Sequence, residues 1–290
     1  MPTLLGFGAI LLWAALALLT SLTTRLPLFE WLALTFGLAT LFSLPMLLRP
    51  GTLASLRAVP VAGWALGIGG LFGYHALYML ALKNAPTAQA GLIAYLWPLL
   101  IVLFSMVGFP LSRWMLPLLG GVLGLVGAGL LVFDPGEGGF RGEYALGYGF
   151  ALACALMWSS YSVLNRRFSA VPTAAVVVYC AAAAVGGLIL SRLFEPWVTP
   201  TALEWVGLVG LALGPMGLAF FVWDFGTKHG NVTLLGALSY FAPLLSTVLL
   251  VLTGRAAPSW ALAAATVLIV GGAGLAALGL RQREGSKIPD

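Results

Sequence analysis

The chain repeats itself across its midpoint, at a constant spacing of half its 290 residues. Trp13 matches Trp158, and the run Gly127–Leu130 recurs as Gly272–Leu275. Other residues at the same spacing are Pro27 and Pro172, Lys83 and Lys228, Gly91 and Gly236, Tyr95 and Tyr240, and Pro98 and Pro243. No gap is needed to align the halves, so the chain is predicted to fold as two similar units.

The composition predicts that these units lie in a membrane. Hydrophobic residues make up 61% of the chain and charged residues only 8%, against about 25% charged in an average soluble domain. A spanning helix needs about 20 apolar residues. We predict ten such helices, near residues 4–24, 30–48, 59–82, 86–109, 114–133, 144–165, 172–192, 203–227, 231–253 and 259–280. No cleavable signal peptide is expected, because the first hydrophobic run is long and lacks a preceding basic segment.

The distribution of basic residues predicts the orientation of the chain. Nine of the 14 Lys and Arg residues fall on the side of the N-terminus, which by the positive-inside rule is the cytoplasm. These nine are Arg49, Arg57, Arg113, Arg166, Arg167, Lys228, Arg281, Arg283 and Lys287. The outer loops hold Arg25, Lys83, Arg141, Arg192 and Arg255. The basic isoelectric point, about 9.5, is thereby explained by membrane topology, and no nucleic-acid partner is expected.

Each half carries five predicted helices, and five is an odd number. The second half therefore enters the membrane from the opposite side, which makes an inverted repeat. The expected fold is an all-α integral membrane protein of ten transmembrane helices in two inverted five-helix repeats. The repeats are assigned to residues 1–138 and 139–290, and a polar linker over 134–139 joins them. This build is typical of secondary transporters, with a site near the bilayer midplane and alternating access.

Three segments are similar to those of a known transporter family. They are GLIAYLWP at Gly91–Pro98, WDFGTKHGNVT at Trp223–Thr233 and SYFAP at Ser239–Pro243. With the ten-helix inverted repeat, they resemble the aromatic amino acid exporter subgroup of the drug/metabolite transporter superfamily (EamA-type). The resemblance implies a central cavity lined by helices 1, 3, 4, 6, 8 and 9.

Aromatic residues predicted at mid-depth are the candidates for the substrate site. Buried phenol and indole groups need hydrogen-bond partners, so a cluster of them away from the membrane surface indicates a hydrated cavity. Ordinary packing is the alternative for any single residue. The predicted substrate-binding residues are Trp13, Tyr74, Tyr78, Tyr95, Trp97, Trp158, Tyr161 and Tyr240, with His75, Ser239 and Trp223 nearby.

Two prolines and three charged residues are the candidates for gating. Pro98 and Pro243 lie inside predicted helices 4 and 9, where each removes a backbone hydrogen bond. They act in opening and closing, or they are static kinks. Pro215 bends helix 8 with no proline at the matching position of helix 3, so the halves are expected to differ mechanically. The charged candidates are Lys83, Asp224 and Lys228, although Lys228 also satisfies the positive-inside bias and can pair with Asp224 while reaching toward the headgroups.

Several functions are excluded by what the sequence lacks. Carriers of phosphorylated substrates need a buried Lys or Arg, whereas here the basic residues fall at helix ends and in loops. An intramembrane protease needs a second membrane Asp or a His-Glu-x-x-His helix, and neither occurs. Cys154 and Cys180 are expected to be small apolar fillers. No enzyme activity, metal or cofactor is predicted.

The sequence thus predicts an inner-membrane exporter of aromatic and other largely neutral amino acids. One alternative is a multidrug exporter of aromatic or quaternary-ammonium cations, which an aromatic cavity also suits. Another is a non-transporting membrane scaffold or channel. Glycine-rich faces on helices 5 and 10 are read as scaffold packing, with a dimer face as the alternative. The expected partners are the amino acid substrate and the lipid bilayer, and the expected assembly is a monomer or weak dimer.

The orientation can be tested by labelling. In a variant without Cys154 and Cys180, a cysteine replacing Gly138 should react with a membrane-impermeant maleimide in intact spheroplasts. A cysteine replacing Ser286 is the matched control, and it should react only after lysis. The reverse pattern would overturn the predicted orientation.

Overall fold

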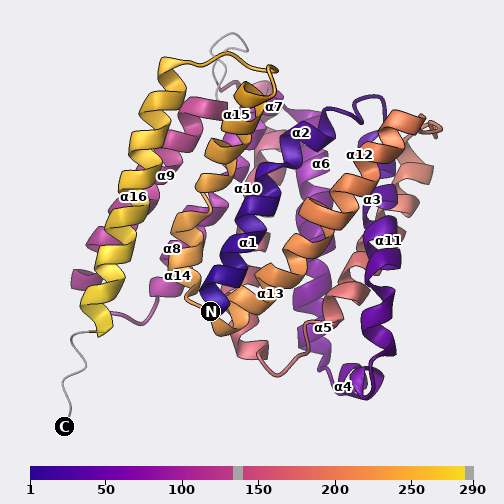
Figure 1. Cartoon of the computed structure of the whole chain (residues 1–290), viewed down its shortest axis with the longest axis horizontal. Coiled ribbons are helices and arrows are strands. Elements are labelled where there is room, and N and C mark those ends of the chain that lie inside the picture. Colours follow the sequence, from indigo (N-terminus) through magenta and orange to yellow (C-terminus); the bar gives the residue numbers. More distant parts are fainter. Residues whose placement is uncertain (133–139, 285–290) are drawn as a thin grey trace.

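The computed structural model describes residues 1–132 and 140–284, and every regular element within them is a helix (Figure 1). The predicted linker over 134–139 lies outside the described residues. The longer helices of the first half are α1 (Pro2–Ala14), α2 (Leu16–Thr20), α3 (Leu28–Ser43), α4 (Thr52–Arg57), α5 (Val61–Ile68), α6 (Tyr74–Asn84), α7 (Thr87–Ala94), α8 (Trp97–Met106) and α9 (Met115–Val132). Those of the second half are α10 (Ala145–Leu164), α11 (Ala175–Phe194), α12 (Ala202–Leu213), α13 (Ala219–His229), α14 (Val232–Leu238), α15 (Phe241–Leu252) and α16 (Trp260–Glu284).

Within the described residues, eight helical stretches are long and apolar enough to cross a membrane, so the chain is a multi-pass membrane protein. They are Pro2–Thr20, Leu28–Leu48, Val61–Asn84, Thr87–Met106, Ala175–Phe194, Ala202–His229, Val232–Leu252 and Trp260–Gly279. Several of them combine two or more of the helices named above. Each corresponds to one of the ten predicted spans. The remaining two predicted spans correspond to α9, whose apolar part is shorter, and to α10.

The two candidate gating prolines lie at breaks between helices. Residues 95–96 separate α7 from α8, and residues 239–240 separate α14 from α15. Pro98 is the second residue of α8 and Pro243 the third of α15. In the first turn of a helix the backbone N–H has no intrahelical partner, so proline is tolerated there. The sequence placed both prolines inside continuous helices, whereas each begins a new helix.

A second pair of irregularities occurs at matched positions in the two halves. The π-helical segments η2 (Gly69–Gly73) and η7 (Gly214–Leu218) interrupt the spans that contain α5–α6 and α12–α13. Their positions differ by the same spacing that relates the sequence repeats. The first half has no proline that matches Pro215, as the sequence shows, but the bend itself was not expected there: the glycine-rich segment Gly69–Gly73 adopts a π turn at the matching position without a proline.

Small residues allow close packing at one side of the molecule, where α9 and α16 lie side by side (Figure 1). A Cβ atom added to Gly120 would meet the carbonyl oxygen of Gly272 and the backbone of Ala276. Lipid provides no hydrophobic drive between helices, so such close contact is what holds them together. The glycine-rich faces predicted on helices 5 and 10 pack against each other within the chain.

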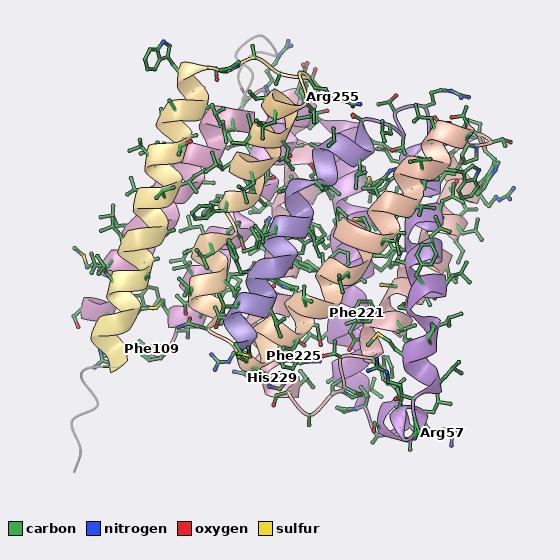
Figure 2. The ribbon with its side chains drawn as sticks, in the orientation of Figure 1. Arg57, Phe109, Phe221, Phe225, His229 and Arg255 are labelled. Atoms are coloured by element: carbon green, nitrogen blue, oxygen red, sulfur yellow. The ribbon has the colours of Figure 1, made fainter. Side chains whose placement is uncertain are left out.

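The basic side chains separate toward two ends of the molecule. Arg57 and His229 lie toward the end that holds the N-terminus and the last turn of α16 (Figures 1 and 2). Arg255 lies at the opposite end (Figure 2).

The contact between α9 and α16 can be tested by substituting one glycine in the interior of each helix. Gly120→Ala should destabilise the protein by about 1–3 kcal/mol, because the methyl group has no room against α16. Gly274→Ala is the control, since its added Cβ would meet nothing within 4 Å, and alanine favours a helix over glycine. Thermal unfolding in detergent measures both, and equal melting temperatures would contradict the packing argument.

Candidate functional site

The described residues line a partly open cavity of about 130 Å³. Its lining comes from both halves of the chain: Trp13, Leu16, Tyr74, His75, Tyr78, Gly91, Ala94, Tyr95, Trp97, Trp158, Met216, Phe220 and Ala242. No residue in this lining carries a permanent formal charge. Only His75 could become charged, by taking up a proton. The cavity is therefore aromatic and polar without being ionic.

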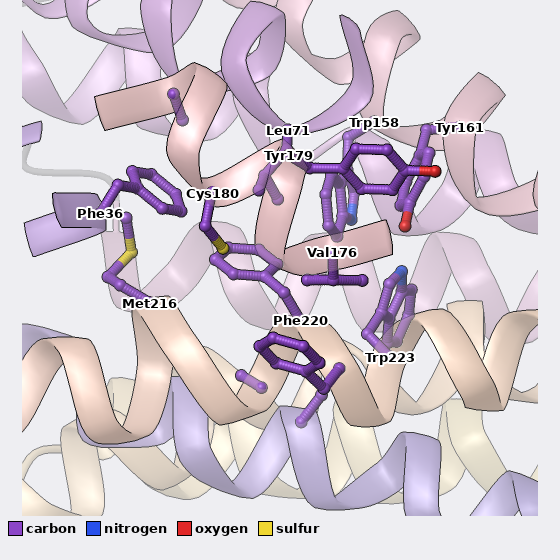
Figure 3. Close-up of a cluster of buried hydrophobic side chains, with 14 of the residues drawn as sticks. Phe36, Leu71, Trp158, Tyr161, Val176, Tyr179, Cys180, Met216, Phe220 and Trp223 are labelled. Carbon is purple, nitrogen blue, oxygen red and sulfur yellow. The ribbon is translucent and has the colours of Figure 1, made fainter. Parts of the chain in front are cut away.

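Four tryptophans from four different helices pack together at the cavity. The ring centroids of Trp13 lie 6.0 Å from Trp97, 5.9 Å from Trp158 and 5.1 Å from Trp223. Trp158 and Trp223 stack at 6.1 Å with an interplanar angle of 20°, and Figure 3 shows them facing each other beside Tyr161 and Phe220. Interlocked rings of this kind hold one another in fixed orientations.

The two π-helical segments each supply a carbonyl that orients a cavity side chain. Trp13 donates its indole N–H to the carbonyl of Pro215 in η7, at 3.0 Å. His75 Nδ1 lies 2.7 Å from the carbonyl of Leu71 in η2. π turns shift the backbone hydrogen-bond register and recur at functional sites, and here each turn anchors one ring of the cavity wall.

The break between α7 and α8 is completed by a side chain from the other half. The hydroxyl of Tyr240 accepts a hydrogen bond from the Leu99 N–H at 3.1 Å and donates one to the Tyr95 carbonyl at 3.4 Å. In an uninterrupted helix those two backbone groups would bond to each other. The hydroxyl is inserted between them, and it bridges the break that positions Tyr95 and Trp97 in the cavity.

The EamA-like transporter family matches residues 1–133 and 145–278. The chain belongs to this family. The family resemblance predicted from the sequence is confirmed, and the family is one of transporters rather than enzymes.

Named relatives of this EamA-family chain are exporters. The aromatic amino acid exporter YddG of Ancylobacter novellus is 51% identical over 279 residues, covering 95% of this chain and 96% of the relative. The aromatic amino acid exporter YddG of Escherichia coli is 26% identical and covers 97% of this chain and 98% of the relative. A solved crystal structure of a protein 50% identical to this chain superposes with a TM-score of 0.91 and covers 98% of each chain.

The EamA-family cavity brings together seven of the eleven predicted binding residues: Trp13, Tyr74, His75, Tyr78, Tyr95, Trp97 and Trp158. The other four lie outside the lining. Tyr161 and Tyr240 direct their hydroxyls to Asp224 and to the helix break. Ser239 donates to the Leu235 carbonyl at 2.7 Å, and Trp223, a member of the tryptophan cluster, donates to the Ser162 hydroxyl at 3.1 Å.

Sequence reasoning missed the small and apolar members of the lining. Leu16, Gly91, Ala94 and Met216 carry no side-chain chemistry that marks a site. Two other lining residues could have been predicted from the sequence repeat. Phe220 matches His75 in the repeat, and Ala242 matches Trp97. The rings of the matched pair His75 and Phe220 lie 5.6 Å apart.

Asp224 is the centre of a buried polar network next to the tryptophan cluster. Its carboxylate is fully buried and lies 2.8 Å from Lys228 Nζ. Thr173 donates to the same oxygen at 2.8 Å. Tyr161 and Asn165 donate to the other carboxylate oxygen at 3.2 and 3.1 Å. The network joins α13 to α10 and to the segment that leads into α11.

The lysines at matched positions, Lys228 and Lys83, are both engaged in ion pairs. The sequence allowed Lys228 to reach toward the headgroups, but its side chain is buried and also donates to the Val171 carbonyl at 2.9 Å. Lys83 pairs with Glu195 and lies 4.6 Å from the ring centre of Phe29. The carboxylate of Glu195 also accepts the Phe29 N–H at the start of α3. The pair therefore ties α6 to α3 and α11.

The bridging role of Tyr240 can be tested by removing one oxygen atom. Tyr240→Phe should lower the free energy of unfolding by about 1–3 kcal/mol, because the Leu99 N–H and the Tyr95 carbonyl lose their partner inside the bundle. Tyr179→Phe is the control, since that ring is also buried and its hydroxyl makes no hydrogen bond to another described residue. Similar melting temperatures for the two variants in detergent would refute the bridge.

Proposed function

We propose that this chain exports aromatic and other largely neutral amino acids by alternating access. The observation that carries the proposal is the central cavity, which has aromatic walls, unpaired polar groups and no lining residue with a permanent charge. The names of the two relatives point to the same substrate class. The chemistry of the cavity explains why an amino acid would fit it.

An amino acid zwitterion needs two polar partners and an apolar wall. The ammonium group is attracted to the faces of the tryptophans and tyrosines. For the carboxylate, α8 and α15 both begin at the cavity, where Trp97 and Ala242 line it. Helix N-termini carry partial positive charge, and broken transporter helices use them to hold carboxylates.

The size of the cavity agrees with this substrate class. A closed apolar cavity of about 150 Å³ holds a benzene molecule, and the present one is about 130 Å³ before any side chain moves. The remaining atoms of an aromatic amino acid would be placed by small movements of the wall during closure.

A second feature favours amino acids over the cations of a multidrug exporter. The indole N–H groups of Trp97 and Trp158 make no hydrogen bond to another described residue. An indole N–H is a donor only, so it requires an acceptor such as a carboxylate oxygen. A quaternary ammonium ion offers no acceptor.

The ten-helix topology remains our proposal for the whole chain. It takes α9 and α10 as the two further spans, because α9 packs along α16 and α10 contributes Trp158 to the cavity. The matched π segments and matched helix breaks support two repeats, over 1–138 and 139–290. We place both termini in the cytoplasm and the protein in the inner membrane. The internal use of the α9 and α16 glycine faces supports a monomer or weak dimer.

We assign the gating roles to the breaks and ion pairs. The breaks at Pro98 and Pro243 are hinges that bend without further loss of backbone hydrogen bonds. The pair of Lys228 with Asp224 holds one end of the bundle closed, and the pair of Lys83 with Glu195 ties helices at the other. Alternating access requires these contacts to break and form in turn.

Counterflow in proteoliposomes tests the proposal. Unlabelled phenylalanine inside the vesicles should accelerate the uptake of labelled phenylalanine, because a carrier exchanges substrate across its two states. Trp97→Ala should weaken apparent affinity several-fold through loss of about 1 kcal/mol of cation–π attraction or more. Trp260→Ala is the control, since Trp260 is 91% exposed on α16. Flux without acceleration would indicate a channel, and transport of quaternary-ammonium cations alone would favour the multidrug exporter.

A further inference from the structure

We propose that His75 accepts a hydrogen bond from the ammonium group of the substrate through its Nε2 atom. The inference rests on the proposed function and adds the orientation of the bound substrate. It states which end of the amino acid lies at which wall of the cavity. It starts from the hydrogen bond on the other side of the ring.

The tautomer of His75 follows from its partner. The carbonyl of Leu71, 2.7 Å from Nδ1, can only accept a hydrogen bond. Nδ1 must therefore carry the proton. In a neutral imidazole the second nitrogen is then an acceptor with a free lone pair.

The orientation of the ring is fixed on several sides. His75 is 6% exposed, and its ring meets those of Phe36, Tyr74 and Phe220 edge-to-face at 4.9, 4.9 and 5.6 Å. Turning the ring over would break the bond to Leu71. His75 lines the cavity, and Nε2 makes no hydrogen bond to another described residue.

The polar groups of the cavity then divide into two kinds. Trp97 and Trp158 present N–H groups, which only donate. His75 Nε2 only accepts, whereas the tyrosine hydroxyls do both. A zwitterion bound with its ammonium at His75 and its carboxylate at the indoles and the start of α8 satisfies all of these groups. In the opposite orientation the carboxylate would meet the Nε2 lone pair and the ammonium would meet N–H groups.

A site built in this way selects for the α-amino group. Sites that hydrogen-bond a substrate group reject analogues that lack it, because the protein atom is then left buried and unpaired. The compound 3-phenylpropionate keeps the ring and the carboxylate of phenylalanine and lacks only the ammonium. It isolates the proposed contact.

The test compares binding of these two compounds to purified full-length protein by isothermal titration calorimetry. His75→Phe keeps the ring and its packing and removes both nitrogens. It should weaken phenylalanine binding about tenfold or more, the usual loss for a hydrogen bond to a charged group. The affinity for 3-phenylpropionate, which lacks the ammonium group, should change by less than about threefold. His75→Gln restores an acceptor near the Nε2 position, and it should recover part of the phenylalanine affinity.

The possible outcomes are distinguishable. Equal weakening of both compounds by His75→Phe, or unchanged phenylalanine binding, would overturn the assignment while leaving amino acid export intact. Failure of the unsubstituted protein to bind phenylalanine would contradict the proposed function, and the assignment with it. A shift in the melting temperature of His75→Phe without ligand reports any general loss of structure, and His75→Gln then decides the question through its ratio of the two affinities.

Discussion

A backbone polar group inside a bilayer must find its partner within the protein. This constraint governs every irregular segment of the structure, since each departure from a regular helix releases N–H or carbonyl groups that lipid cannot satisfy. At the break between α7 and α8, the hydroxyl of Tyr240 meets the Leu99 N–H and the Tyr95 carbonyl. At the π turns, the carbonyls of Leu71 and Pro215 meet His75 and Trp13. These irregular segments lie around the cavity. The side chains that hydrogen-bond to their freed backbone groups therefore also set the positions of the cavity walls.

The sequence predicted the components of this arrangement better than their contacts. The repeat spacing and the composition were enough to predict a multi-pass membrane protein and to bring Trp13 and Trp158 together. The apolar lining residues were not predicted, because the sequence does not distinguish a leucine or alanine in a cavity wall from one that faces lipid. Lys228 was misplaced because a basic residue near a helix end ordinarily faces the headgroups, and the local sequence does not reveal that the carbonyl of Val171, far along the chain, accepts a hydrogen bond from its buried ammonium group.

Tyr240 illustrates where symmetry alone misleads. It matches Tyr95 in the repeat, and both were expected in the cavity, yet only Tyr95 lines it. The ring of Tyr240 packs onto Gly124, which leaves space for it. The residue that matches Gly124 in the second half is Ile269, a fully packed side chain. Tyr95 has no equivalent slot and turns to the cavity instead. A single glycine thus decides whether a repeated tyrosine supports the fold or faces the substrate.

The charge of the cavity has a consequence for the electrical behaviour of the protein. A charge that crosses the membrane field gains or loses about 2.3 kcal/mol per 100 mV. No lining residue bears a permanent charge, and the network beside the cavity places Asp224 and Lys228 together as a neutral pair. A zwitterion adds no net charge when it binds. In the proposed export of zwitterions, turning a loaded cavity from one face of the membrane to the other would therefore carry no net charge through the field, and substrate gradients rather than the membrane potential would act on this step.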